Sequence, residues 1–240
     1  MDKDINQEIS SKIMVEKPQN FPTDLWSKLI NFSEPLMDAR KGFEHHTWTA
    51  VYWADKIAKA AIDEKIVNPD SNPQIDLTVL AFLHDLGYSG VTSGIYNDDK
   101  SRVTDAAKEK HQIISAELAE KFFSENKEII GKYLDQQKQK SLVEIIRVHD
   151  SLAHASDNKL LALFIEVDSI ATIDMRFGQP SVPKESLTNW LMTRPLGYKK
   201  HQNGKYERDI ASGRYGVFLT SFGKTSYISL SKELIKYAKS

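Results

Sequence analysis

Six side chains of the types that bind metal ions occur in an ordered series along this chain. They are His46, the adjacent pair His84 and Asp85, His111, His149 and Asp168. Imidazole nitrogens and carboxylate oxygens are ligands that divalent transition metals take in proteins. Because the sequence has no cysteine, thiolate sites, disulfides and thiol nucleophiles are excluded. Any metal ion would have to be held by these histidines and carboxylates.

The spacing of the apolar residues places these ligands on the buried faces of predicted helices. Neighbours on one helix face recur every three or four residues, and from His46 this walk meets only alanine and isoleucine. His45 shares a mixed face, so we expect it to support the site indirectly or to lie at the surface. The other candidate ligands interrupt similar apolar stripes. His84 and Asp85 are about 100° apart on a helix, so they can share one ion only if it lies over the seam between them.

The number of these residues decides between a metal site and an ordinary core. A single histidine on an apolar face is more often a hydrogen-bonded core residue than a ligand. Four histidines and two aspartates in one core would each need a separate compensating partner, and evolved cores rarely bury charges without pairing or a metal. The sequence therefore predicts a metal site inside a helical bundle.

The apolar periodicity predicts that the chain is helical almost throughout, up to about Phe177. The expected helices run from Thr23 to Met37, Glu44 to Lys65, Ile75 to Leu86, Asp105 to Ser124, Gln139 to His149 and Lys159 to Arg176. At 240 residues, the chain has room for one large domain or for one domain with an appendage.

After Phe177 the pattern changes, with one more helix expected from Lys184 to Met192. Two strands, Tyr215 to Phe222 and Thr225 to Leu230, read as a small β-hairpin. We therefore expect an all-α fold with a C-terminal β-hairpin appendage. Its parts would be an N-terminal extension (1–22), a helical metal-binding domain (23–178), and a C-terminal extension (179–240) whose helix and hairpin pack on the core.

Charge and hydropathy argue against two classes of partner. Lys and Arg number 32 and Asp and Glu number 33, so no net charge favours a nucleic-acid polymer or a membrane surface. The longest apolar run, Leu160 to Ile165, is far short of the roughly 20 residues that a membrane span needs. Residues 1–17 lack the apolar core of a signal peptide. We expect a cytoplasmic protein that acts on a small molecule, with a homodimer as one alternative for its assembly.

His46, the segment AFLHDLGY over residues 81–88, and Asp168 resemble the H…HD…D signature of the HD-domain superfamily of metal-dependent phosphohydrolases. The resemblance covers about residues 44–176 and implies a helical bundle. His111 and His149 are similar to the two additional histidines of the bimetal branch. That branch includes cyclic-nucleotide phosphodiesterases and some di-iron oxygenases.

The resemblance implies how the ligands divide between one or two divalent ions. The first ion would take His46, His84, Asp85 and Asp168. Asp85 would bridge to a second ion completed by His111 and His149, and the pair His84 and Asp85 would lie at the reacting centre as catalytic residues. Such an imidazole-rich site favours manganese, iron, cobalt, nickel or zinc over magnesium, which prefers oxygen ligands.

The activity implied is hydrolysis of a small phosphoester, a nucleotide or another phosphorylated metabolite, by a metal-activated water. Many family members carry a lysine after the HD-x-G turn, where this chain has Tyr88. This departure argues against lysine assistance and leaves Tyr88 as a candidate hydrogen-bond donor to a phosphate oxygen. The candidate substrate-binding cations, each with a solvated surface charge as its alternative, are Lys100, Arg102 and Arg176.

Two other functions stay open on the same residues. A di-iron oxygenase on the HD scaffold would use the same six ligands. A non-enzymatic signalling protein would use the metal only to stabilise its fold. Hydrolysis is preferred because it is commoner in the superfamily, and the full ligand set argues mildly against the non-enzymatic alternative.

Overall fold

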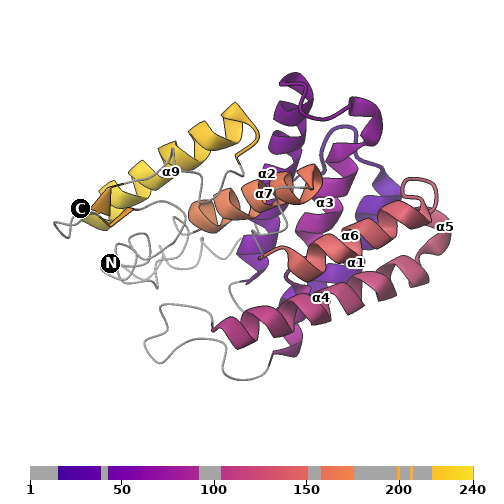
Figure 1. The fold of residues 1–240 in the computed structure, drawn as a ribbon. Coiled ribbons are helices and arrows are strands. Elements are labelled where there is room, and N and C mark those ends of the chain that lie inside the picture. Colours follow the sequence, from indigo (N-terminus) through magenta and orange to yellow (C-terminus); the bar gives the residue numbers. More distant parts are fainter. Residues whose placement is uncertain are drawn as a thin grey trace, which may run out of the picture.

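The computed structural model describes residues 16–38, 43–91, 104–150, 158–175, 199–200, 206–207 and 218–239. These ranges are almost entirely helical, as predicted (Figure 1). The helices are α1 (Thr23–Asp38), α2 (Phe43–Asp63), α3 (Pro73–Leu83), α4 (Asp105–Glu125), α5 (Lys127–Ile130), α6 (Gln136–Val148), α7 (Lys159–Asp174) and α9 (Ser221–Lys239). Two 3-10 turns, η1 (Pro69–Ser71) and η2 (Leu86–Gly90), flank α3. No helix in the described part is long and apolar enough to cross a bilayer.

The six helices expected up to Phe177 are all present, and their ends differ from the predicted ones by a few residues. The difference that matters is at α3, which ends at Leu83 rather than Leu86. His84 and Asp85 therefore lie at the helix end and not inside it. The helix expected from Lys184 to Met192 lies outside the described residues.

The predicted hairpin from Tyr215 to Leu230 is wrong, because α9 covers its whole second strand. The buried residues Gly223, Tyr227 and Leu234 recur at intervals of three to four residues or their multiples, which is helical spacing. The short alternation that suggested a strand is only part of this longer pattern. A different antiparallel pair, β1 (Lys199–Lys200) with β2 (Tyr206–Glu207), lies outside the predicted hairpin.

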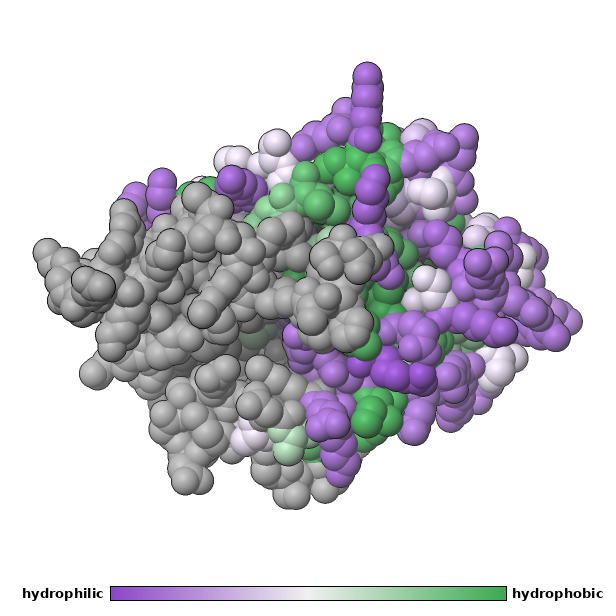
Figure 2. Space-filling view, viewed as in Figure 1, coloured by the Kyte–Doolittle hydropathy of each residue, from purple (hydrophilic) through white to green (hydrophobic). Residues whose placement is uncertain are grey.

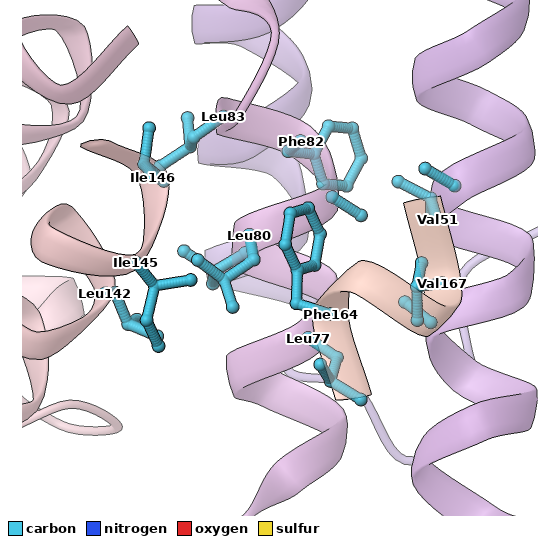
Figure 3. Close-up of a cluster of buried hydrophobic side chains, with 14 of the residues drawn as sticks. Val51, Leu77, Leu80, Phe82, Leu83, Leu142, Ile145, Ile146, Phe164 and Val167 are labelled. Atoms are coloured by element: carbon cyan, nitrogen blue, oxygen red, sulfur yellow. The ribbon is translucent and has the colours of Figure 1, made fainter. Parts of the chain in front are cut away.

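The bundle is built around α3, which contacts α1, α2, α4, α6 and α7. All of its residues from Asp76 to Leu83 are buried, as expected for a helix surrounded by others. Figure 3 shows side chains of α3 between those of α6 on one side and those of α2 and α7 on the other. Each fully buried Leu or Phe side chain in this layer contributes about 1.5–3 kcal/mol to the free energy of unfolding. This burial fixes where the C-terminal end of α3 lies.

The outer helices cover this layer and leave their polar residues at the surface. Figure 2 shows hydrophilic side chains dominating the face over the α4, α5 and α6 ends. Helix α9 packs on α7 and α2, and lies beside α7 in Figure 1. The chain's C-terminal part is therefore anchored on two helices of the central bundle.

One buried ion pair joins α3 to α6. Asp76 is 2 % exposed, and its Oδ2 accepts a hydrogen bond from Lys138 Nζ at 2.6 Å. Oδ1 has no hydrogen-bond partner among the described residues. Burial raises the pKa of Asp76 to about 6, and the nearby Lys138 ammonium offsets only part of this effect. The folded chain therefore binds a proton here more tightly than the unfolded chain does.

We expect Asp76→Asn to become progressively more stable than the unaltered chain as pH rises. The raised folded-state pKa means that the carboxyl's contribution to stability is fully present below pH 3.8 and is lost as pH passes through about 6. Asparagine stays neutral, so the variant should gain about 1–3 kcal/mol in relative unfolding free energy between about pH 4 and 7. Urea unfolding of both chains across this range measures it. Lys138→Met should increase the loss of stability with rising pH, because it removes the ammonium group that favours the charged carboxylate. Parallel pH profiles of stability for the unaltered chain and Asp76→Asn would contradict the account.

Candidate metal centre

The six candidate ligands, which come from five helices and their ends, converge inside the bundle. His46 lies on α2, His111 on α4 and Asp168 on α7. His84 and His149 are the C-terminal caps of α3 and α6, and Asp85 follows His84 directly. All four of these histidines are at most 5 % exposed. A buried cluster of this kind needs a source of positive charge to hold its nitrogen and oxygen atoms together.

The end of α3 lets two adjacent residues face the same centre. His84 still has helical backbone angles, whereas Asp85 has φ −106° and ψ 0°, outside the helical region. The side chains of His84 and Asp85 are therefore not held at the helical separation of about 100°. His84 Nε2 and Asp85 Oδ2 come within 3.4 Å of each other.

The two oxygens of Asp85 face different pairs of imidazoles. Oδ2 lies 3.4 Å from the Nε2 atoms of both His46 and His84. Oδ1 lies 3.2 Å from His111 Nε2 and 3.6 Å from His149 Nε2. Within each pair the Nε2 atoms are 3.2 Å apart for His46 and His84, and 3.3 Å apart for His111 and His149. Asp85 therefore offers one carboxylate oxygen to each pair of imidazoles.

Asp168 joins one of these pairs. Its Oδ1 lies 2.9 Å from His46 Nε2 and 3.7 Å from His84 Nε2. We call His46, His84, Asp85 and Asp168 the first ligand group, and Asp85, His111 and His149 the second ligand group. In each group, three side chains offer ligand atoms within 4.8 Å of one another: His46, His84 and Asp85 in the first, Asp85, His111 and His149 in the second. The structure thus brings the six candidate ligands together in two groups that share Asp85.

Hydrogen bonds to backbone carbonyls fix the direction of three imidazoles. The Nδ1 atoms lie 3.1 Å, 3.3 Å and 2.7 Å from carbonyl oxygens, in the pairs His84–Ala81, His111–Ala107 and His149–Ile146. A carbonyl only accepts, so each Nδ1 carries a proton, and a ring that is neutral in this tautomer turns an Nε2 lone pair to the centre. Facing lone pairs 3.3 Å apart repel unless a proton or a metal ion lies between them. The residues therefore fit a divalent metal site.

Within the cluster, protons compete with a metal ion for the histidine nitrogens. Burial by itself would lower the pKa of His84, but the negative charges of Asp85 and Asp168 outweigh it and raise that pKa to about 10. Burial would likewise raise the pKa of Asp85, yet the charge of His84 and hydrogen bonds from His111 and His149 hold it well below its usual range. Without metal, the raised pKa keeps His84 protonated, so metal binding at this ring must release a proton.

The turn after Asp85 is held against α4, one helical turn beyond His111. Gly87 N donates a hydrogen bond to Ser115 Oγ at 2.8 Å, and a Cβ on Gly87 would lie 2.0 Å from His111 O. Only glycine permits this approach. The next residue, Tyr88, stacks on the His111 ring with centroids 3.9 Å apart and planes 7° apart.

Not every candidate residue enters the cluster. Lys100, Arg102 and Arg176 lie outside the described residues. His45 is half-buried and belongs to neither ligand group in the described part of the chain. Sequence reasoning gave no role to Phe164, whose ring lies edge-on to His84 with centroids 5.1 Å apart; its place on the stripe of Asp168, one helical turn earlier, was the signal.

We expect Gly87→Ala to destabilise the fold and weaken metal binding, because the new methyl group collides with the backbone of α4. Overpacking of this kind costs about 1–3 kcal/mol or more. Gly90→Ala is the matched control: its Cβ would meet only two methyl groups of the Ile114 side chain, at 3.1 Å and 3.4 Å. Urea unfolding and metal content of both variants measure the difference. Equal effects at the two glycines would contradict the role given to Gly87.

Comparison with family models places this site in a known family. Residues 43–169 match the HD domain, which is more than half of the 240-residue chain and includes all six candidate ligands. Neither the search of curated proteins nor the search of solved structures finds a match. The HD-domain family consists largely of metal-dependent phosphohydrolases. With its H…HD…D residues brought to one buried centre, the chain belongs to the HD-domain family.

Proposed function

We propose that this chain is a metal-dependent phosphohydrolase that hydrolyses a small phosphoester, such as a nucleotide or a phosphorylated metabolite. The observation that carries the proposal is the position of Asp85, with one oxygen on each pair of imidazoles. Paired divalent ions held in this way supply a water of lowered pKa and polarise phosphoryl oxygens. Family membership supports the same class of reaction.

The ligand set suits an anionic substrate. Four of the six ligands are neutral imidazoles when they bind metal, and only Asp85 and Asp168 bring negative charge. Two carboxylates do not neutralise two divalent cations, so the loaded centre keeps a positive charge for a phosphate group. The same preponderance of imidazole favours manganese, iron, cobalt, nickel or zinc over magnesium.

Other side chains would complete the binding of the phosphate. Tyr88, stacked on His111, holds that imidazole plane, and we propose that its hydroxyl donates a hydrogen bond to a phosphate oxygen. Lys100, Arg102 and Arg176 are proposed, from the sequence alone, to neutralise the remaining phosphate charge. Their role follows from the need for cations around a developing negative charge.

We expect metal-dependent hydrolysis of at least one phosphoester, measured by the phosphate it releases or, for cyclic nucleotides, by the nucleoside monophosphate it forms, and the loss of this activity in His46→Ala. The panel should include nucleoside phosphates, cyclic nucleotides and sugar phosphates, each with the five favoured metals. His45→Ala is a matched control, because it removes the adjacent imidazole, which lies outside both ligand groups. The loss in His46→Ala should exceed about a hundredfold, as expected for removal of a group at a metal centre.

Two outcomes would contradict the proposal. A chain that holds metal but hydrolyses no member of the panel would count against phosphoester hydrolysis. Equal activity in His45→Ala and His46→Ala would show that the hydrolysis does not use this centre. Oxygen uptake by the iron-loaded chain, without hydrolysis of any phosphoester, would favour the oxygenase alternative.

A further inference from the structure

We propose that α9, which lies outside the range matched by the HD domain, holds the Asp168 side of the metal centre in place, and that Glu166 is the positioning residue that connects them. The inference rests on the proposed metal centre. It adds a supporting element, α9, that lies outside the residues matched by the HD domain. It starts from a buried carboxylate that the proposed chemistry does not use.

Glu166 and Asp168 point to different sides of α7. They are two residues apart, which is about 200° around a helix. Asp168 contacts His46, whereas Glu166, 1 % exposed, turns to the segment that leads into α9. Its Oε2 accepts hydrogen bonds from Leu219 N at 3.0 Å and Thr220 N at 3.3 Å, and its Oε1 accepts one from Thr220 Oγ1. Three donors from one short segment therefore fix the carboxylate.

The N-terminal end of α9 is bound by carboxylates from two ligand-bearing helices or their ends. The first N–H groups of a helix have no partner within it and attract negative charge. Glu64, directly after α2, accepts hydrogen bonds from Ser221 N at 2.7 Å and Phe222 N at 3.1 Å. Glu166 of α7 accepts hydrogen bonds from Leu219 and Thr220, the two residues that precede Ser221. The start of α9 thus joins the end of α2 to the middle of α7.

The close approach of α9 to Glu166 is built into the sequence. A Cβ on Gly223 would lie 1.7 Å from Glu166 Oε1, so a larger residue here would displace the Glu166 carboxylate from its position. Gly223 N also donates to Thr220 Oγ1 at 2.8 Å. Further along α9, Tyr227 and Leu234 are buried in the same hydrophobic core as the residues of α7.

Asp168 is the ligand that most needs such support. Its side chain is 23 % exposed, compared with at most 10 % for the other five ligands. Fewer neighbours hold it directly, so its position depends on how α7 is turned about its axis. Ligand geometry at a metal site must be kept within about 10–20°. Fixing the opposite side of α7 at Glu166 fixes the side that carries Asp168.

The test is the affinity of the two ligand groups for Co²⁺ in Glu166→Gln, measured by titration of the full chain and followed by visible absorption. Glutamine keeps the size of the side chain but cannot accept all three hydrogen bonds. We expect affinity at the first ligand group to fall about 10–100-fold, as for other residues that support metal ligands. The second ligand group, on α4 and α6, should change less than about twofold. General loss of structure would weaken both groups, so their difference separates positioning from folding.

Glu64→Gln is the matched control, since it removes the other carboxylate at the start of α9 without touching α7. An equal effect of Glu64→Gln and Glu166→Gln would overturn the role of Glu166. If Glu166→Gln does not fold, Thr220→Val removes one donor to Glu166 and should show the same selective, smaller loss. Unchanged affinities in the folded variant would overturn this inference alone. Two-site binding without phosphoester hydrolysis would overturn only the proposed function, and no Co²⁺ binding by the unaltered chain would overturn both.

Discussion

The two oxygens of Asp85 are the point on which the rest of the structure depends. One faces the imidazoles of His46 and His84, and the other faces those of His111 and His149. Four buried rings with their Nε2 atoms turned to one centre repel one another unless negative and positive charges alternate between them. Asp85 supplies negative charge to both halves at once. Its position therefore decides where four helices must place their histidines.

The fold meets this requirement through the helix that ends beside Asp85. Because α3 is buried among five other helices, its C-terminal end lies deep in the bundle. If α3 continued as a helix through Asp85, the side chains of His84 and Asp85 would be held about 100° apart around its axis. The contact of Gly87 with Ser115 holds the turn after Asp85 against α4. Asp168, the ligand on α7, is supported from the opposite side of that helix, at Glu166. Packing at a distance thus sets the geometry of the centre.

Much of this could be predicted from the sequence, because helical periodicity is a local property. The stripe on which His46 lies already indicates that it is buried. The start of helix α9 could not be predicted in this way. Its first turn is satisfied by Glu166 and Glu64, 54 and 157 residues away from the residues they bind, and such partners leave no local pattern. Gly223 lies between the two predicted strands, where a hairpin would turn, but in the structure it lies within α9, close to Glu166. The early end of α3 was missed because Leu86 continues the helical spacing of Val79 and Leu83.

The central claim is that Asp85 lies between two metal ions, and anomalous X-ray diffraction from crystals of the metal-loaded chain tests it most directly. We predict a pair of anomalous peaks a few ångströms apart, about 3.5–4 Å as in other two-metal sites. One should lie among His46, His84, Asp85 and Asp168, and the other among Asp85, His111 and His149. A single peak on one side of Asp85 would contradict the bridging role, and no peak at the cluster would contradict the metal centre itself.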